Sequence, residues 1–193
     1  MFVKICGLTS LDDTLAAARA GALAVGFNFV PSSPRFIEEE SLAEWIGQVP
    51  DHIWKVGVFA DQPSDAVAGM CERLGLDVAQ LHGSELPSAM PSNVRVWKAV
   101  RIHADFSAAK LDEFQTEAVL LDGPASGVTF NWSAVRSTGC KVILAGGLDS
   151  TNVCDAIRTV QPWGVDVCSR IETSPGKKDH QLMTQFIKRA LSC

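Results

Sequence analysis

A cysteine ends the first apolar segment of the chain, in the run Val3-Lys4-Ile5-Cys6-Gly7-Leu8-Thr9. A thiol at the end of a strand, facing a loop, can act as a base or as a nucleophile. The alternative is a small buried apolar side chain, which is the usual role of a free cysteine. A base must be partly thiolate, whereas a free thiol has a pKa of about 8.5. We expect Lys4 to point to the opposite side of the strand, so the sequence names no activating partner for Cys6.

A carboxylate ends a later apolar run, Val119-Leu120-Leu121-Asp122. A carboxyl group beside the low-dielectric core has a raised pKa and can serve as a general acid. The alternative is an aspartate that caps or anchors a loop. His82 follows the run ending at Leu81 and is a candidate substrate-binding residue, with a structural, hydrogen-bonded histidine as the favoured alternative. Because no second histidine or acidic pair lies at metal-ligand spacing, we expect no metal site.

Two further segments are suited to binding anions. Arg35 follows a proline-stiffened loop, and its fork of N–H donors fits a carboxylate or a phosphate, unless it is a solvated surface residue. Gly146-Gly147 precedes a helix predicted near Ser150, and two residues without Cβ let backbone N–H groups approach a phosphate. A simple strand-to-helix turn is the alternative reading of the glycine pair. The segment Val167–Ser169 is expected to form the other wall of this phosphate site.

These residues share one position, because each ends or follows an apolar segment. The apolar segments read as near-continuous runs, which is typical of parallel strands covered on both faces. They are Phe2–Leu8, Ala24–Phe29, Trp54–Ala60, Val78–Leu81, Val94–Ile102, Ala118–Asp122, Lys141–Ala145 and Gly164–Ser169.

Segments with helical spacing alternate with these strands. They are Leu11–Ala20, Glu38–Gln48, Pro63–Leu74, the short Glu85–Met90, Asp105–Phe114, Trp132–Ser137, Ser150–Val160 and His180–Leu191, with a loop over Gly123–Asn131. Eight such repeats predict a compact (β/α)8 TIM barrel of the α/β class, in which the site lies at the carboxyl ends of the strands. An open doubly wound sheet is the alternative, but no G-x-G-x-x-G loop follows the first strand.

The bulk composition limits the partners. The 193 residues suit one domain, 1–193, and a net charge of −5 without a basic block argues against nucleic acid. Six cysteines form no C-x-x-C pair and are spread too widely to indicate a disulfide or zinc framework. With neither a signal peptide nor a membrane-spanning run, we expect a cytoplasmic protein without a membrane partner. A monomer is expected, with a homodimer as the alternative.

Several motifs together resemble the phosphoribosylanthranilate isomerase family of tryptophan biosynthesis, from residue 3 to about residue 189. They are Lys4-Ile5-Cys6-Gly7-Leu8-Thr9, Ser33-Pro34-Arg35, Lys55-Val56-Gly57-Val58-Phe59, Gln80-Leu81-His82-Gly83, Leu120-Leu121-Asp122, Thr129-Phe130-Asn131-Trp132, Ala145-Gly146-Gly147-Leu148, Gly164-Val165-Asp166-Val167 and Pro175-Gly176-Lys177-Lys178-Asp179. The resemblance implies an Amadori rearrangement of N-(5′-phosphoribosyl)anthranilate without a metal or organic cofactor.

The resemblance also implies roles for individual residues. Cys6 would be the general base that removes the C2′ proton, and Asp122 the general acid that opens the ribose ring. Arg35 would bind the anthranilate carboxylate, and Asp166 would contact the sugar hydroxyls or order the last loop. The phosphate would be bound by Gly146, Gly147 and Ser169, and Arg170 could add a charged contact to it.

The chain departs from the family pattern in two places. The family usually reads Ser-Ser-Gly-Val-Glu where this chain has Cys168-Ser169-Arg170-Ile171-Glu172, which removes a glycine near the expected phosphate site. The loop over 123–128 is also shorter and less rich in glycine.

The sequence also allows two other function classes. A bifunctional histidine/tryptophan isomerase would need two phosphate cradles and a carboxylate at the first strand end. A non-catalytic barrel that binds a phosphorylated ligand would lack the acid or the base.

Overall fold

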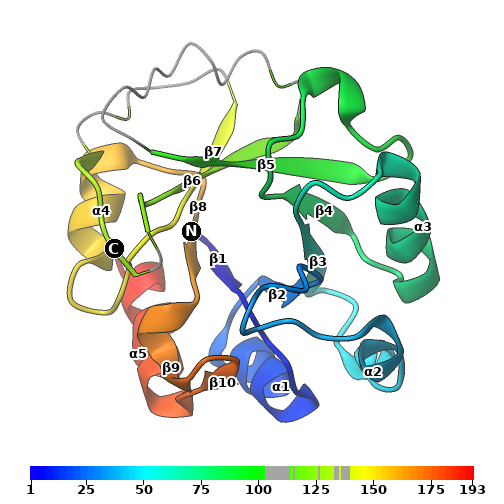
Figure 1. Ribbon diagram of the computed structural model, residues 1–193. Coiled ribbons are helices and arrows are strands. Elements are labelled where there is room, and N and C mark those ends of the chain that lie inside the picture. Colours follow the sequence, from blue (N-terminus) through cyan, green and yellow to red (C-terminus); the bar gives the residue numbers. More distant parts are fainter. Residues whose placement is uncertain (103–113, 115, 126, 133–134, 136–139) are drawn as a thin grey trace.

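Eight parallel strands form a closed barrel in this computed structural model, which describes residues 1–102, 114, 116–125, 127–132, 135 and 140–193. Each strand pairs with its neighbours in chain order, and β8 pairs back onto β1 (Figure 1). The predicted TIM barrel is therefore confirmed. The strands are β1 Phe2–Ile5, β2 Ala24–Asn28, β3 Trp54–Phe59, β4 Val78–Leu81, β5 Arg95–Arg101, β6 Ala118–Asp122, β7 Lys141–Leu144 and β8 Gly164–Val167.

The helices lie outside the ring of strands (Figure 1). They are α1 Leu11–Ala20, α2 Glu39–Ala43, α3 Ser64–Leu74, α4 Val153–Val160 and α5 His180–Leu191, with 3-10 turns η1 Ile46–Gln48, η2 Pro87–Ala89 and η5 Ser169–Ile171. A hairpin of β9 Glu172–Ser174 and β10 Lys177–Lys178 precedes α5. Among the residues described, no helix is long and apolar enough to cross a membrane.

The predicted helices differ from the observed ones mainly at their ends. Glu38–Gln48 is split into α2 and η1, Glu85–Met90 is reduced to a single 3-10 turn, and α4 begins three residues after Ser150. Most of the helices predicted over 105–114 and 132–137 lies outside the described residues.

Local sequence signals explain where the helices start and stop. The Ser10 side chain accepts a hydrogen bond from the Asp13 N–H at 3.3 Å, which caps α1. Gly21 ends the same helix with φ +105°, a conformation that only glycine adopts without strain. The Asp179 carboxylate caps α5 by accepting from the Gln181 and Leu182 N–H groups.

Aromatic side chains fill the barrel at the amino ends of the strands. Phe2 stacks on Trp163 with a ring-centroid distance of 4.2 Å, and Trp54 stacks on Trp97 at 5.9 Å. The Phe2 and Trp97 rings meet edge to face at 5.9 Å. Tryptophans that are scattered in the sequence therefore come together in space, because each lies at or near the start of a strand. This plug closes one end of the barrel and leaves the carboxyl ends of the strands for the site.

The structure corrects the expectation about cysteine pairing. Cys154 in α4 and Cys193, two residues beyond α5, form a disulfide that spans 39 residues of sequence. Helices α4 and α5 pack against one another on the outside of the barrel. Sequence spacing could not show this pairing, because two neighbouring helices bring the sulfurs together only after the barrel has closed.

Candidate active site

A cavity of about 200 Å³ opens at the carboxyl ends of the strands, and all eight strands or their following loops contribute to its lining. Every site residue predicted from the sequence lies in this lining: Cys6, Arg35, His82, Asp122, Gly146, Gly147, Asp166, Ser169 and Arg170. The lining also includes residues to which the sequence assigned no individual role, namely Asn28, Val58, Gln80, Arg101, Leu120 and Cys168. Strand parity could have found several of them, since Leu120 and Asp122, or Asp166 and Cys168, are two residues apart and share a face.

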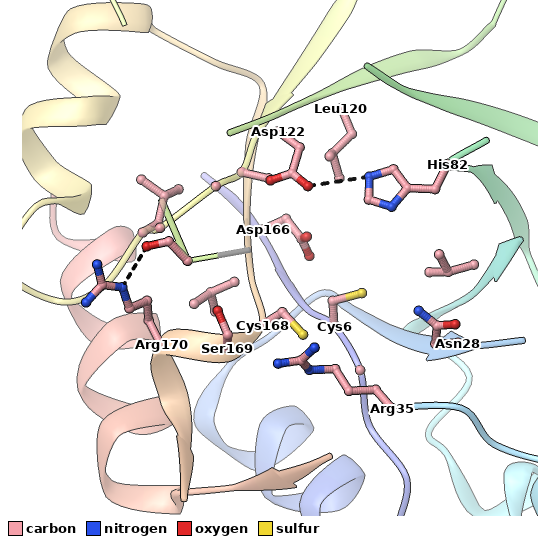
Figure 2. Close-up of a pocket in the computed structure, with 18 of the residues that line it drawn as sticks. Cys6, Asn28, Arg35, His82, Leu120, Asp122, Asp166, Cys168, Ser169 and Arg170 are labelled. Carbon is pink, nitrogen blue, oxygen red and sulfur yellow. Dashed lines mark hydrogen bonds and ion pairs between the residues drawn. The ribbon is translucent and has the colours of Figure 1, made fainter. Parts of the chain in front are cut away.

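Cys6 lies at the end of β1 with its thiol at the cavity and only 8% of the residue exposed. A hydrogen bond from the Cys168 thiol, together with the positive charge of Lys4, outweighs burial and lowers the pKa of Cys6 to about 7. Close to half of the thiol is then thiolate at neutral pH. Figure 2 shows the Cys6 and Cys168 side chains as neighbours in the cavity, with the Cys6 sulfur pointing away from Cys168 and the Arg35 guanidinium below both.

The expectation for Lys4 was wrong. Residues two apart in a strand point to the same face, so Lys4 lies beneath Cys6 inside the barrel, fully buried. Its Nζ donates to Asp166 Oδ1 at 2.8 Å. Burial alone would lower the pKa of Lys4, but the Asp166 carboxylate and the Cys6 thiolate raise it well above its usual range. Lys4 therefore stays charged and supplies a fixed positive charge below the thiol.

Asp122 ends β6 on the far side of the cavity from Cys6, with Asp166 between them (Figure 2). Burial and the nearby Asp166 charge raise the pKa of Asp122 to about 6. The Gly123 N–H donates to Asp122 Oδ1 at 2.8 Å and fixes the carboxyl group. Asp122 Oδ2 faces His82 Nε2 at 3.6 Å, so this oxygen is available to a ligand. The group thus meets the requirements for a proton donor close to neutral pH.

His82 is not the hydrogen-bonded structural histidine that the sequence favoured. Its Nε2 atom is buried and has no hydrogen-bond partner among the described residues. Burial and the charges of Lys4 and Arg101 lower the pKa of His82 to about 4, so the ring is neutral. Gln80 Oε1, in the same cavity wall, is also buried without a partner in the described part of the chain. Two unpaired polar atoms in one cavity indicate places for a polar ligand.

Arg35 is positioned by a carboxylate from the other end of the chain. Its Nε donates to Glu172 Oε1 at 2.9 Å and its Nη2 to Glu172 Oε2 at 2.7 Å. Lys178 Nζ, from β10, also donates to Glu172 Oε1 at 2.7 Å. This bidentate pair orients the guanidinium at the cavity, with Nη1 outside the pairing with Glu172.

The glycine pair after β7 makes room for another loop as well as for a ligand. A Cβ on Gly147 would lie 2.8 Å from the Thr129 nitrogen, and one on Gly146 would lie 2.7 Å from Gly123 Cα. Gly146 and Gly147 have left-handed φ values of +79° and +66°, respectively. Only glycines therefore allow the loop after β6 to pack across the end of β7.

Arg170 does not strain the last loop, although glycine is usual there in the family. It lies within η5, and its φ is outside the left-handed region. Its Nε donates to the Gly127 carbonyl at 3.1 Å, which ties the loop after β8 to the loop after β6 (Figure 2).

Within the described part of the chain, one possible metal cluster lies on the outside of the barrel. Asp12, Asp13 and His180 place ligand atoms within 4.8 Å of one another, although their spacing in sequence gave no such signal. Asp13 already accepts hydrogen bonds from the Lys178 N–H at 2.9 Å and contacts His180 Nε2 at 2.7 Å. These contacts give the cluster a structural role in joining α1 to α5.

The fold and the cavity define the class of the protein: it is a TIM barrel with a cavity of ionisable side chains at the carboxyl ends of its strands. Over residues 3–189 the sequence matches the family described as N-(5'phosphoribosyl)anthranilate (PRA) isomerase. The chain therefore belongs to the phosphoribosylanthranilate isomerase family.

Individual relatives are similar along their whole length. An N-(5'-phosphoribosyl)anthranilate isomerase from Solibacter usitatus is 45% identical over 98% of this chain and 97% of its own. The crystal structure of the isomerase from Thermotoga maritima superposes with a TM-score of 0.94 at 35% identity, and covers 100% of both chains. Another solved isomerase, in complex with reduced 1-(o-carboxyphenylamino)-1-deoxyribulose 5-phosphate, has a TM-score of 0.89 at 33% identity, with 100% of both chains covered.

Proposed function

We propose that this protein is a phosphoribosylanthranilate isomerase of tryptophan biosynthesis. It converts N-(5′-phosphoribosyl)anthranilate into 1-(2-carboxyphenylamino)-1-deoxyribulose 5-phosphate. The observation that carries the proposal is a thiol with a lowered pKa and a carboxyl with a raised pKa in one cavity, at Cys6 and Asp122. An isomerase needs such a matched acid and base, because it moves protons without net loss or gain.

Asp122 is the proposed general acid. It gives its proton to the ring oxygen of the ribose, the bond from C1′ to that oxygen breaks, and the anilino nitrogen forms a double bond to C1′. Burial and the Asp166 charge favour the protonated carboxyl, which the reaction consumes in this step. The neutral ring of His82 lies beside the carboxyl and does not compete for its proton.

Cys6 is the proposed general base. It removes the proton from C2′, the electrons form a double bond between C1′ and C2′, and the C1′–N π electrons return to nitrogen. Ketonisation at C2′ with protonation of C1′ then completes the rearrangement. Lys4 and Cys168 support this role, because both favour the thiolate.

The remaining lining residues are proposed to bind the substrate. The part of the Arg35 guanidinium that does not pair with Glu172 would bind the anthranilate carboxylate. Gly146, Gly147, Ser169 and Arg170 would bind the phosphate, where the loops after β6, β7 and β8 meet. Asp166 and the unpaired His82 Nε2 would contact the sugar hydroxyls. The structure solved with a 5-phosphate analogue in a relative supports a ligand of this kind.

The described loops after β3 and β4 give no support to a second phosphate cradle, which favours one substrate over a bifunctional isomerase. In the loops after β3 and β4, the chain's own carboxylates already bind the backbone N–H groups. Glu85 Oε1 accepts from Asp61 N at 2.9 Å and from Gly83 N at 3.2 Å, and Asp61 Oδ1 accepts from Ser84 N at 2.6 Å. Lys98 Nζ holds Glu85 at 2.7 Å. A bisphosphate substrate would meet negative charge here.

The proposal extends to the state of the protein. We expect residues 1–193 to act as one domain, as a monomer with a homodimer as the alternative, on a small phosphorylated substrate. Nucleic acid and membrane partners are not expected, given the net charge of −5 and the absence of a spanning helix among the described residues. A thiol base must remain a free thiol, which favours the reducing cytoplasm, where the Cys154–Cys193 pair would be largely reduced.

The test combines purified protein with two auxotrophic strains. The protein should convert phosphoribosylanthranilate, followed by chromatography, and should restore growth of a strain lacking this step of tryptophan synthesis. A strain lacking the analogous histidine-pathway isomerase should not grow, and its growth would overturn the single-substrate proposal. Cys6→Ser should lower kcat by about 10²–10⁴-fold while binding of a product analogue is nearly unchanged. A near-normal rate would remove Cys6 from the role of base.

A further inference from the structure

A lysine of β5 bridges the backbone on both sides of His82. Lys98 lies opposite Leu81 in the parallel register of β4 and β5, and it points away from the barrel interior because Trp97 before it points inward. Its Nζ atom donates to the Gly83 carbonyl at 2.7 Å and to the Leu81 carbonyl at 3.4 Å. These two carbonyls flank His82 in sequence. The ammonium group therefore holds the backbone of His82 from outside the barrel, while the His82 side chain faces the cavity.

The Glu85 carboxylate pairs with this lysine and extends the contacts to a second loop. Its Oε2 accepts from Lys98 Nζ at 2.7 Å, and its Oε1 accepts from the Asp61 N–H at 2.9 Å and from the Gly83 N–H at 3.2 Å. In return, Asp61 Oδ1 accepts from the Ser84 N–H at 2.6 Å. The loop after β4 is therefore fastened both to β5 and to the loop after β3.

The backbone around His82 has little room to move. A Cβ on Gly83 would lie 2.6 Å from the Asp61 nitrogen, closer than real contacts of this kind. Asp61 itself has a left-handed φ of +57°, which is uncommon for a residue other than glycine. The His82 N–H donates to the Phe59 carbonyl at 2.7 Å. His82 is therefore fixed through its own N–H and through the carbonyls on either side of it.

The Lys98–Glu85 pair is buried but does not reach the cavity. The two side chains are 4% and 7% exposed, and Lys98 Nζ also lies 5.9 Å from the centre of the Phe114 ring. Among the described residues that line the cavity, neither member of the pair is found. Burying two charges is costly unless each has well-placed partners, and this pair has its partners in the backbone around His82. A substrate in the cavity therefore senses the pair only through the residues that the pair holds.

The His82 ring that this backbone carries is directed at Asp122. Its Nε2 lies 3.6 Å from Asp122 Oδ2, and Figure 2 shows the ring facing the carboxyl group. We propose that Lys98 and Glu85 are positioning residues for the reaction: they hold the His82 ring beside Asp122, so that one fixed geometry serves both the sugar hydroxyl and the acid. The inference rests on the proposed function of the cavity. A small displacement of the ring should be costly, because reacting groups must be held in place.

The test variants leave no buried charge alone. Lys98→Met combined with Glu85→Gln removes both charges and keeps the net charge of the protein, whereas Lys98→Met by itself would leave the Glu85 carboxylate buried without its partner. Glu85→Gln by itself leaves the lysine its two carbonyl acceptors, and is a second variant expected to act in the same direction by less. The matched control is Lys141→Met combined with Glu117→Gln, an exposed pair 3.1 Å apart whose lysine begins β7 at the amino end of the barrel.

The first measurement is NMR of the histidine rings in the protein without ligand, with the His82 signals assigned by their loss in His82→Gln. The parent should give one sharp set of His82 ring signals. These signals should shift and broaden in the Lys98→Met/Glu85→Gln variant, because the ring is no longer held in one place, and should be unchanged in the control. Unchanged His82 signals in that variant would overturn the proposal. This measurement needs no substrate, so it does not depend on the proposed reaction.

The second measurement is a double-mutant cycle on kcat/KM with phosphoribosylanthranilate. The Lys98→Met/Glu85→Gln change should lower kcat/KM by about 10-fold or more when His82 is present. In a His82→Gln background it should have little further effect, because the ring through which the pair acts is gone. Equal losses in both backgrounds would show that the pair supports only the fold, and would overturn the proposal. If the parent itself does not turn over the substrate, the proposed reaction fails, and the ring signals alone decide the positioning.

Discussion

The pKa values of Cys6 and Asp122 are in the opposite order to their proposed roles, because the base has the higher pKa and the acid the lower one. The base has a pKa of about 7 and the acid a pKa of about 6, so at equilibrium the proton prefers the thiol. The productive form, thiolate with protonated carboxyl, is a minority species. The cavity therefore gains a strong acid and a reactive base at the cost of a low population of the active state.

The pH dependence of kcat/KM should reflect this order. Activity should be bell-shaped with a maximum near pH 6.5, since lower pH protonates Cys6 and higher pH ionises Asp122. The thiol pKa is the higher of the two, so raising it, as in Cys168→Ala, should move the alkaline limb of the profile to higher pH and lower the maximum. The acid limb follows the lower pKa, that of Asp122, and should stay in place. Steady-state rates across the pH range would check this. A profile that keeps rising to pH 9 would contradict it.

At the scale of elements, β2 limits the space next to the Cys6 and Lys4 side chains. A Cβ at Gly26 would lie 3.0 Å from Cys6 Sγ and 3.1 Å from Lys4 Nζ, closer than ordinary contacts. We predict that Gly26→Ala lowers kcat by about 10-fold or more, because small displacements of a catalytic group are costly. Kinetics with a melting curve would separate this from unfolding. The control is Gly47→Ala, where a Cβ meets nothing within 4 Å; equal losses in both variants would contradict the prediction.

The secondary-structure elements also explain how much of the candidate site could be predicted from the sequence. The apolar runs predict the strands, and the barrel rule then places Cys6, Asp122 and Arg35 in one cavity, because parallel strands end at the same rim. The residues that position these side chains could not be predicted in the same way. Glu172 reaches Arg35 through the β9–β10 hairpin, which no pattern indicated. Lys4 was misplaced by a wrong parity, and two-residue periodicity would have put it under Cys6.

At the scale of the whole molecule, the two ends of the barrel have separate tasks. The amino ends hold the aromatic plug around Trp97, and the carboxyl ends hold the cavity. The disulfide between Cys154 and Cys193 lies outside both and fastens the last residue of the chain to α4. It is therefore expected to affect stability without affecting the chemistry.

Cys193→Ser tests that separation. Chain entropy alone gives a cross-link over 39 residues a stabilisation of up to about 4 kcal/mol. In non-reducing buffer the variant should melt at a lower temperature than the parent, and in reducing buffer the two should melt together. kcat should be unchanged throughout. Identical melting temperatures in non-reducing buffer would show that the disulfide does not stabilise the fold.

The closure of β1 onto β8 also sets the order in which activity can arise during synthesis. Lys4 meets Asp166, its partner 162 residues later in the chain, only when the last strand docks. On a ribosome adding about 5–20 residues per second, the first strand waits on the order of 10–30 s for that contact. Until then the Cys6 thiol has neither Cys168 beside it nor the closed cavity around it, so it keeps the ordinary pKa of a free thiol.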